Sequence, residues 1–130
     1  MPHRFSLRVY YEDTDLAGIV YYANYLKFIE RARSEWVREL GVDQARMKDQ
    51  QGIVFAVSRV EVDYKSPAHF DDVLCVETKL ERVTAARMVL HQCVLREDKV
   101  LFDGLITLVC ISDDGMPSRI PADIRQMMQP

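Results

Sequence analysis

Two very short connections constrain the fold of this chain more than any other feature of its sequence. Three segments rich in apolar residues follow one another at residues 73–83, 87–97 and 101–112. The first two are separated only by residues 84–86, and the last two only by residues 98–100, with a turn at Asp98 and Lys99. Connections this short join antiparallel strands, because a parallel crossover needs a dozen residues or more. The sequence therefore predicts two consecutive β-hairpins.

Two earlier segments, residues 5–11 and 53–65, also alternate apolar and polar side chains with the period of a half-buried strand. Between them, residues 25–40 have the three- and four-residue spacing of one apolar helical face. Those apolar positions are Tyr25, Phe28, Ile29, Ala32, Trp36 and Leu40. Gly41 then supplies the backbone freedom that ends a helix, and residues 121–128 predict a short terminal helix.

This order of elements predicts an α+β fold, with an antiparallel sheet of about five strands wrapped around one long central helix. No strand–helix–strand repeat is present, so a parallel α/β sheet is excluded. Residues 105–111 are apolar on both faces. We therefore expect a second subunit to cover one of those faces, and pairing between subunits would also protect the open sheet edges.

The composition fits one domain over residues 1–130, since 48% of the residues are hydrophobic. The formal charge of −3 and the scattered basic residues exclude a nucleic-acid binder. No apolar run reaches the roughly 18 residues of a membrane span, and we expect a cytoplasmic protein. Cys75, Cys93 and Cys110 lie singly in strand-like segments, so we expect reduced core thiols and no metal site.

The chemistry of the chain is concentrated just before the predicted helix. Asp13 and Asp15 precede Gly18 and a helix N-terminus. This stretch therefore brings carboxylates close to the free backbone N–H groups of a helix start. Acyl transfer needs this pairing of a base or nucleophile with donors for a developing oxyanion. The ordinary alternative is that one aspartate caps a turn while the other is solvated.

Other catalytic patterns are missing. The sequence has no GxSxG elbow, and His3, His69 and His91 have no recognisable nucleophile partner. An aspartyl-phosphate mechanism would require the parallel sheet that the element order excludes.

The residues around the two aspartates resemble the signature of a known family, the YbgC-like branch of the 4-hydroxybenzoyl-CoA thioesterase family. The matching residues are Tyr11-x-Asp13-Thr14-Asp15-x-x-Gly18-x-Val20-Tyr21-x-x-x-Tyr25, followed by Glu30-Arg31-Ala32-Arg33 and Val62-x-Tyr64. The resemblance extends over nearly the whole chain.

This resemblance implies a single hotdog thioesterase domain that hydrolyses acyl-CoA thioesters. Asp15 is then the catalytic carboxylate, acting either as general base or as nucleophile, and Asp13 supports it. The backbone N–H of Tyr22 polarises the thioester carbonyl. Coenzyme A is part of the substrate, so no cofactor and no metal are implied.

The resemblance also implies a homodimer or homotetramer with sites at the subunit interface. The candidate substrate contacts are Gly18, Val20 and Tyr25 of the signature, Val57, Ser58 and Arg59 lining the partner's pocket, and Arg59, Arg82 and Arg87 for the coenzyme A phosphates. For each arginine, the ordinary alternative is a solvated surface position.

Two other functions remain open at this point. One is a non-catalytic module that binds acyl-CoA or acyl carrier protein and is associated with the envelope or lipid metabolism. The other is a dehydratase of hydroxyacyl thioesters, which would need a histidine near the helix, although none lies between His3 and His69. Many YbgC-like chains have a histidine where this one has Tyr22. The acyl group, the carrier and the choice between dimer and tetramer are not fixed by the sequence.

Overall fold

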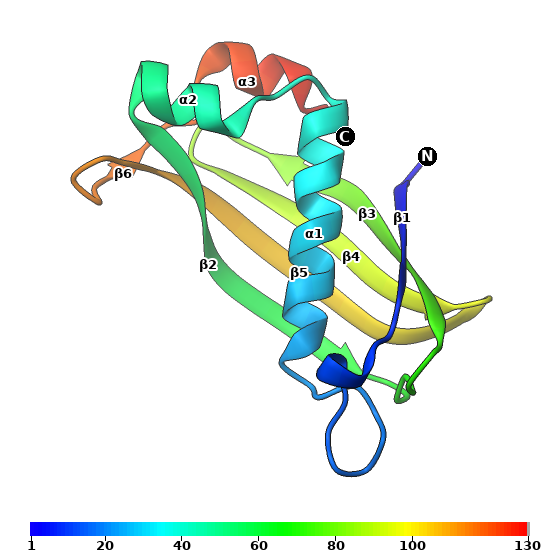
Figure 1. The fold of residues 1–130 in the computed structure, drawn as a ribbon. Helices are drawn as coiled ribbons and strands as arrows, with labels where there is room; N and C mark the ends of the chain where they lie inside the picture. Colours follow the sequence, from blue (N-terminus) through cyan, green and yellow to red (C-terminus); the bar gives the residue numbers. More distant parts are fainter. Residues whose placement is uncertain (130) are drawn as a thin grey trace.

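A curved antiparallel sheet forms the body of the protein, as the computed structural model of residues 1–129 shows (Figure 1). Its strands are β1 (His3–Arg8), β2 (Ile53–Tyr64), β3 (Val73–Val83), β4 (Arg87–Arg96) and β5 (Lys99–Ser112), together with the two-residue β6 (Pro117–Ser118). They are ordered β1-β3-β4-β5-β2, with β6 beside β5. The predicted antiparallel sheet is confirmed, with six strands where about five were expected.

Both predicted hairpins are present, β3–β4 and β4–β5. The remaining neighbours are distant in sequence, because β1 pairs with β3 and β2 pairs with β5. The sheet therefore has β1 at one edge and β2 at the other. The β2 ladder shifts register between Val57 and Arg59, which marks a bulge at Ser58 on the β2 edge.

The structure does not confirm a single long helix. Residues 1–129 contain three helices: α1 (Asn24–Glu39), α2 (Gln44–Gln51) and α3 (Ala122–Met127), of 16, 8 and 6 residues. The prediction missed α2 because its residues are almost all polar and lack an apolar period. Residues typical of helix termini were nevertheless present in the sequence. At the start of α2 the Asp43 side chain accepts a hydrogen bond from the Arg46 N–H, and at its end Gly52 takes a left-handed conformation.

The first predicted strand also ends early. The sequence pattern extended it to Tyr11, but β1 stops at Arg8 and a 3-10 turn, Tyr11–Asp13, follows. Val9 is completely buried, and its N–H and carbonyl bond to Asp72 and Asp71. The chain therefore turns toward α1 at this point and leaves the sheet.

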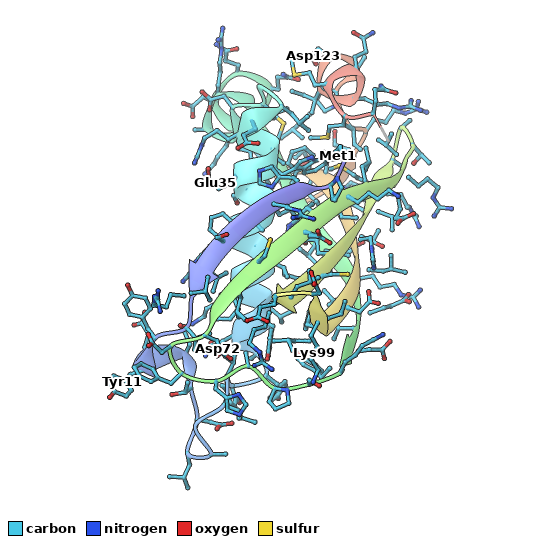
Figure 2. All side chains as sticks on the ribbon, turned by 90° about the vertical axis from the view of Figure 1, so that its right-hand side faces the viewer. Met1, Tyr11, Glu35, Asp72, Lys99 and Asp123 are labelled. Carbon is cyan, nitrogen blue, oxygen red and sulfur yellow. The ribbon has the colours of Figure 1, made fainter. Side chains whose placement is uncertain are left out.

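The core lies between the concave face of the sheet and α1, which crosses that face (Figure 1). Phe28, Ile29 and Ala32 of α1 are buried against sheet residues such as Leu90 and Ile106. Helices α2 and α3 sit together at one end of α1. The loop that carries Asp15 projects from the other end, where Tyr11 and Asp72 also lie (Figure 2).

The outer face of the sheet is partly exposed. In β5, Ile106 and Leu108 are buried beneath α1, whereas Leu105 on the other face is 40% exposed. A second subunit over that face remains a prediction. The three cysteines are free thiols. Cys93 and Cys110 are buried, as expected, whereas Cys75 is only half-buried. None of the helices within residues 1–129 is both long and apolar enough to cross a membrane.

Candidate active site

The loop that carries Asp15 is a small, tightly bonded hairpin. The Asp15 N–H donates to the Ile19 carbonyl at 2.9 Å, and the Tyr21 N–H donates to the Asp13 carbonyl at 2.9 Å. At the tip, the Gly18 N–H donates to the Asp15 carbonyl at 3.0 Å. Gly18 has φ of +79°, a conformation in which glycine is favoured because a Cβ would be strained. The turn is therefore ordered by its own backbone.

The Asp15 carboxylate is exposed and held inside this turn. Its Oδ1 accepts a hydrogen bond from the Ala17 N–H at 2.9 Å. The other oxygen, Oδ2, has no hydrogen-bond donor within residues 1–129. The side chain thus caps the turn with one oxygen and presents the other to solvent, so the capping role and a catalytic role are compatible.

Asp13 fastens the loop to the start of α1. It is buried, and its Oδ2 accepts the Tyr10 N–H at 2.8 Å. Its carbonyl oxygen accepts both the Tyr21 N–H and the Asn24 side-chain amide, each at 2.9 Å. Asp13 therefore supports the loop, and it is Asp15 that faces solvent.

The backbone N–H of Tyr22 has no hydrogen-bond acceptor among residues 1–129. The preceding carbonyl, that of Tyr21, accepts the Asn24 N–H at 2.8 Å. Because N–H and C=O point in opposite directions across a trans peptide, this bond turns the Tyr22 N–H away from α1. A free donor at the positive end of a helix is suited to binding an oxyanion.

Tyr64, at the end of β2, fixes the peptide group between Tyr22 and Ala23. Its hydroxyl donates to the Tyr22 carbonyl at 3.0 Å, and the two rings pack edge to face. Burial raises the pKa of Tyr64, so the hydroxyl remains a donor at neutral pH. Sequence reasoning missed this role, because the only signal was the place of Tyr64 in the family signature.

Two of the expected substrate contacts are core residues. Val20 is 4% exposed and Tyr25 is 3% exposed. The Tyr25 ring stacks on Phe102, and its hydroxyl accepts the Ala68 N–H at 3.1 Å. Burial raises the pKa of Tyr25. Both side chains hold the loop in place, and direct contact with substrate stays a prediction for them, whereas Gly18 is exposed at the tip.

The segment after β2 packs along the same loop. Ile19 forms a β-bridge with His69, and the Arg96 guanidinium bonds to Asp72 at 2.8 Å. Partial burial alone would raise the pKa of Asp72. The His69 N–H and the Arg96 guanidinium outweigh burial and hold that pKa below its ordinary value.

The remaining predicted contacts lie away from this loop in the same chain. Val57, Ser58 and Arg59 are exposed on the β2 edge, where the Arg59 guanidinium pairs with Glu61 at 2.6 Å. Arg82 and Arg87 are exposed beside the β3–β4 turn, and the carbonyl of Ala85 in that turn accepts the N–H of Ile120, just before α3. A site combining these residues with Asp15 would need a second chain.

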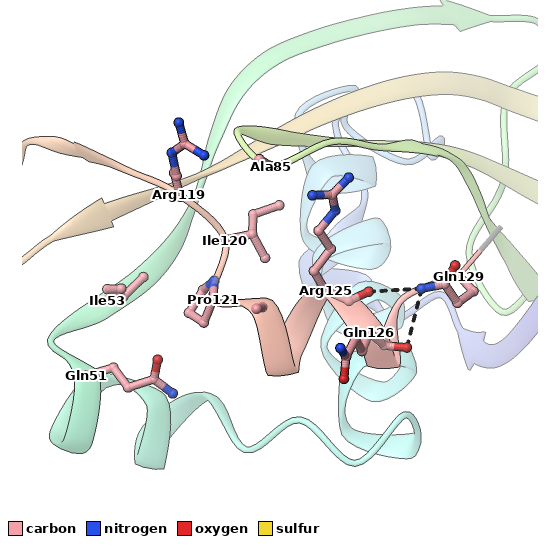
Figure 3. Close-up of a pocket in the computed structure, with 10 residues that line it drawn as sticks. Gln51, Ile53, Ala85, Arg119, Ile120, Pro121, Arg125, Gln126 and Gln129 are labelled. Carbon is pink, nitrogen blue, oxygen red and sulfur yellow. Dashed lines mark hydrogen bonds between the residues drawn. The ribbon is translucent and has the colours of Figure 1, made fainter.

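The most prominent hollow, of about 600 Å³, lies between α3 and the start of β2 (Figure 3). Arg119 and Arg125 line it, and neither guanidinium forms an ion pair within residues 1–129. Neither Asp15 nor Tyr22 lines this hollow. Neither residue lines any of four further hollows within residues 1–129. A single chain therefore does not enclose Asp15 in any of these five hollows.

Comparison with known sequences identifies the family. Residues 17–102 match the thioesterase superfamily. The chain is 37% identical to the acyl-CoA thioesterase YbgC of Haemophilus influenzae, over 93% of this chain and 90% of that protein. It is 33% identical to the acyl-CoA thioester hydrolase YbgC of Escherichia coli O157:H7, over 95% and 96% of the two chains.

Solved structures agree with the sequence comparison. A probable thioesterase from Bartonella henselae superposes with a TM-score of 0.89 at 34% identity, over 93% of this chain and all of that one. A 4-hydroxybenzoyl-CoA thioesterase variant in complex with 4-hydroxybenzoyl-CoA superposes with a TM-score of 0.92 over 98% and 99% of the two chains. At 22% identity, this second likeness shows the fold alone. Because the family match covers well over half of the chain, the protein belongs to the thioesterase superfamily.

Proposed function

We propose that this protein hydrolyses acyl-CoA thioesters to a carboxylic acid and coenzyme A. The observation that carries the proposal is the unpaired Tyr22 N–H at the start of α1, next to the loop that presents Asp15. Membership of the thioesterase superfamily supports the same chemistry, as do relatives named as acyl-CoA thioesterases.

In this mechanism, the thioester carbonyl oxygen accepts the Tyr22 N–H. Negative charge grows on that oxygen as the tetrahedral intermediate forms, so a fixed donor at the helix N-terminus stabilises the transition state more than the substrate. The Tyr21–Asn24 hydrogen bond and the Tyr64 hydroxyl keep this turn in place before substrate binds.

Asp15 can supply the nucleophile in two ways. As a general base, it removes a proton from water while the water oxygen attacks the thioester carbon. As a nucleophile, its free oxygen attacks the carbon, a mixed anhydride forms and water then hydrolyses it. In both routes the C–S bond breaks and the thiolate of coenzyme A takes a proton. A single turnover in oxygen-18 water with enzyme in excess separates them, because only the anhydride route leaves label in Asp15.

We infer that a second copy completes the site through the free edge of β2. Antiparallel pairing of two β2 strands about a two-fold axis would bring the Ile53 end of one strand near Tyr64 of the partner subunit. The hollow with Arg119 and Arg125 would then lie toward the partner's Asp15 loop, where guanidinium groups suit the phosphates of coenzyme A. In this arrangement α1 is the central helix of each hotdog domain.

Thiol release from a panel of aliphatic and aromatic acyl-CoAs tests the function. Asp15→Asn should lower kcat by about 10²- to 10⁴-fold, the usual effect of losing a general base or nucleophile. Its amide oxygen can still accept the Ala17 N–H, so the loop and the melting temperature should be kept. Glu12→Gln is the matched control, since Glu12 is an exposed carboxylate in the preceding turn.

Two results would overturn the proposal. One is a parent protein that binds acyl-CoA but releases no thiol from any member of the panel, which would favour the non-catalytic module. The other is a folded Asp15→Asn variant with the parent rate.

A further inference from the structure

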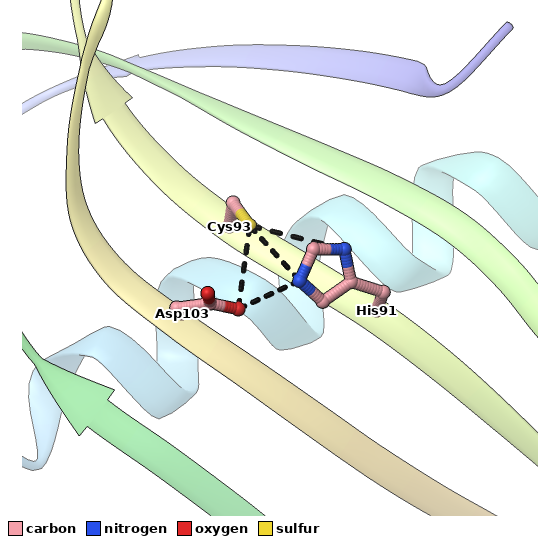
Figure 4. A group of neighbouring side chains, drawn as sticks. All are labelled: His91, Cys93 and Asp103. Carbon is pink, nitrogen blue, oxygen red and sulfur yellow. Dashed lines mark hydrogen bonds and ion pairs between the residues drawn. The ribbon is translucent and has the colours of Figure 1, made fainter.

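Three side chains with different metal-binding chemistry converge on the outer face of the sheet (Figure 4). His91 and Cys93 lie two residues apart on β4, and Asp103 lies opposite Cys93 on β5. The intervening Gln92 donates a hydrogen bond to the Ile29 carbonyl of α1, so its two neighbours point to the face away from the helix. The thioesterase chemistry proposed for the Asp15 loop uses none of the three.

Two of the three donor–donor distances match the edges of a metal tetrahedron. Cys93 Sγ lies 3.3 Å from His91 Nε2 and 3.6 Å from Asp103 Oδ1. Zinc bonds of ~2.3 Å to sulfur and ~2.1 Å to nitrogen or oxygen, at tetrahedral angles, place such donors roughly 3.3–3.6 Å apart. The 2.6 Å contact between His91 Nε2 and Asp103 Oδ1 is shorter because it is a hydrogen bond, which a metal ion would replace.

The same geometry is unsuited to a cysteine nucleophile. In a catalytic triad, the two nitrogens of the histidine contact different partners, so that a proton can pass through the ring. Here His91 Nε2 makes the closest contact with both Cys93 and Asp103. Burial, and then the nearby Asp103 carboxylate, raise the pKa of Cys93 to about 12. The thiol is therefore protonated at neutral pH unless a cation replaces its proton.

Acidic side chains and an open hollow give a divalent cation access to this place, where it would compete with the Lys65 ammonium, 3.9 Å from Asp103 Oδ2. A hollow of about 430 Å³ adjoins the group and is lined by Glu61, Asp63, His91 and Asp103, among others. Asp63 is the register partner of Asp103 across β2 and β5. A Cys93 thiolate and an Asp103 carboxylate would neutralise a dication, and a neutral imidazole would complete the ligand set.

We propose that His91, Cys93 and Asp103 bind one divalent transition metal of the zinc class, with the fourth position open to water on the Asp63 side. On binding, the Cys93 thiol proton is released to solvent, and the His91 ring carries its hydrogen on Nδ1. The metal would link β4 to β5. This proposal departs from the expectation of no metal site, which was drawn from the isolated cysteines in the sequence. The spacing along the chain could not indicate the site, because the third ligand comes from the neighbouring strand.

Titration with cobalt(II) as a probe for zinc tests the site. Protein stripped with a chelator and kept reduced should bind one equivalent with the absorption of a sulfur-to-cobalt charge transfer and of tetrahedral cobalt. Binding should tighten as the pH rises, because a proton is released. Cys93→Ser should abolish the charge-transfer band. It should also weaken cobalt binding by more than the ~10- to 100-fold that follows from removing a residue that only hydrogen-bonds to a metal ligand.

Cys75→Ser is the matched control, since Cys75 is a half-buried free thiol on the outer face of β3. It should keep both the band and the affinity. If Cys93→Ser does not fold, His91→Gln replaces it, because that ring is about one-third exposed. A parent protein without the charge-transfer band at saturating cobalt, or a band that Cys75→Ser removes and Cys93→Ser keeps, overturns the proposal.

Discussion

The hydroxyl of Tyr64 donates a hydrogen bond to the carbonyl oxygen of Tyr22 across 3.0 Å, although the two residues are 42 positions apart. This bond joins the end of the edge strand β2 to the turn before α1. The turn also carries the unpaired Tyr22 N–H. The position of the proposed oxyanion donor therefore depends on β2 as well as on α1.

Tyr64→Phe should lower kcat about tenfold, the rate equivalent of the ~1–1.5 kcal/mol that one hydrogen bond contributes. The ring and its packing on Tyr22 are kept, so KM should change little. Steady-state kinetics and urea unfolding measure both effects. Tyr11→Phe is the control, because the Tyr11 hydroxyl makes no hydrogen bond within residues 1–129. Equal losses in the two variants would contradict a positioning role for Tyr64.

Gly18→Ala should lower both stability and activity, whereas Gly115→Ala should lower stability alone. The two glycines have φ of +79° and +78°, and a Cβ at either would meet no atom within 4 Å. Each substitution should therefore cost about 1 kcal/mol of backbone strain. Only Gly18 lies in the Asp15 loop, so only its substitution should reduce kcat/KM. Equal kcat/KM values in the two variants would argue against that loop as the site.

Gln92→Leu should destabilise the fold by about 3 kcal/mol, since it leaves buried polar groups unpaired. Gln92 is completely buried. Its amide donates to the Ile29 carbonyl and the Thr78 hydroxyl, and its oxygen accepts the Arg33 guanidinium. Urea unfolding of this variant and of Gln126→Leu, at an exposed position, measures the difference. Similar midpoints would show that the network contributes little.

The Asp72–Arg96 pair should stabilise the protein at neutral pH and lose this effect in acid. The pKa of Asp72 is lowered in the folded protein. An aspartate of this kind stabilises the fold above its unfolded pKa, ordinarily near 3.8, and the contribution disappears as the pH falls through the folded pKa. The free energy of unfolding of Asp72→Asn should therefore lie below that of the parent at pH 7, and the two should converge as the pH falls through the lowered pKa of the folded protein. A constant difference at all pH values would contradict the prediction.

Val60→Lys should convert the proposed dimer into monomers and reduce activity with it. Val60 is 40% exposed on the β2 edge, and a lysine there opposes pairing of two edges. Sedimentation velocity and thiol release are the measurements. Met116→Lys, at an exposed position in the turn before β6, should leave both unchanged. A monomeric Val60→Lys variant with full activity would place the complete site in one chain.

Much of the fold could be predicted because its signals are local. The period of two and the short turns placed β3, β4 and β5 to within about two residues, and the apolar spacing placed α1 equally well. The predictions failed where local signals were weak or overridden. Helix α2 has hardly any apolar residues, and β1 ends before Val9 although the apolar alternation continues to Tyr11.

The sequence by itself determined the order of elements, the sheet hairpins and the identity of the carboxylate loop, because periodicity, turn length and residue type are properties of neighbouring residues. The tertiary structure alone decided that Tyr64 reaches Tyr22, that Val20 and Tyr25 are buried, and that His91 and Cys93 meet Asp103. These relationships depend on strand register and on the packing of distant segments, which side-chain periodicity does not specify.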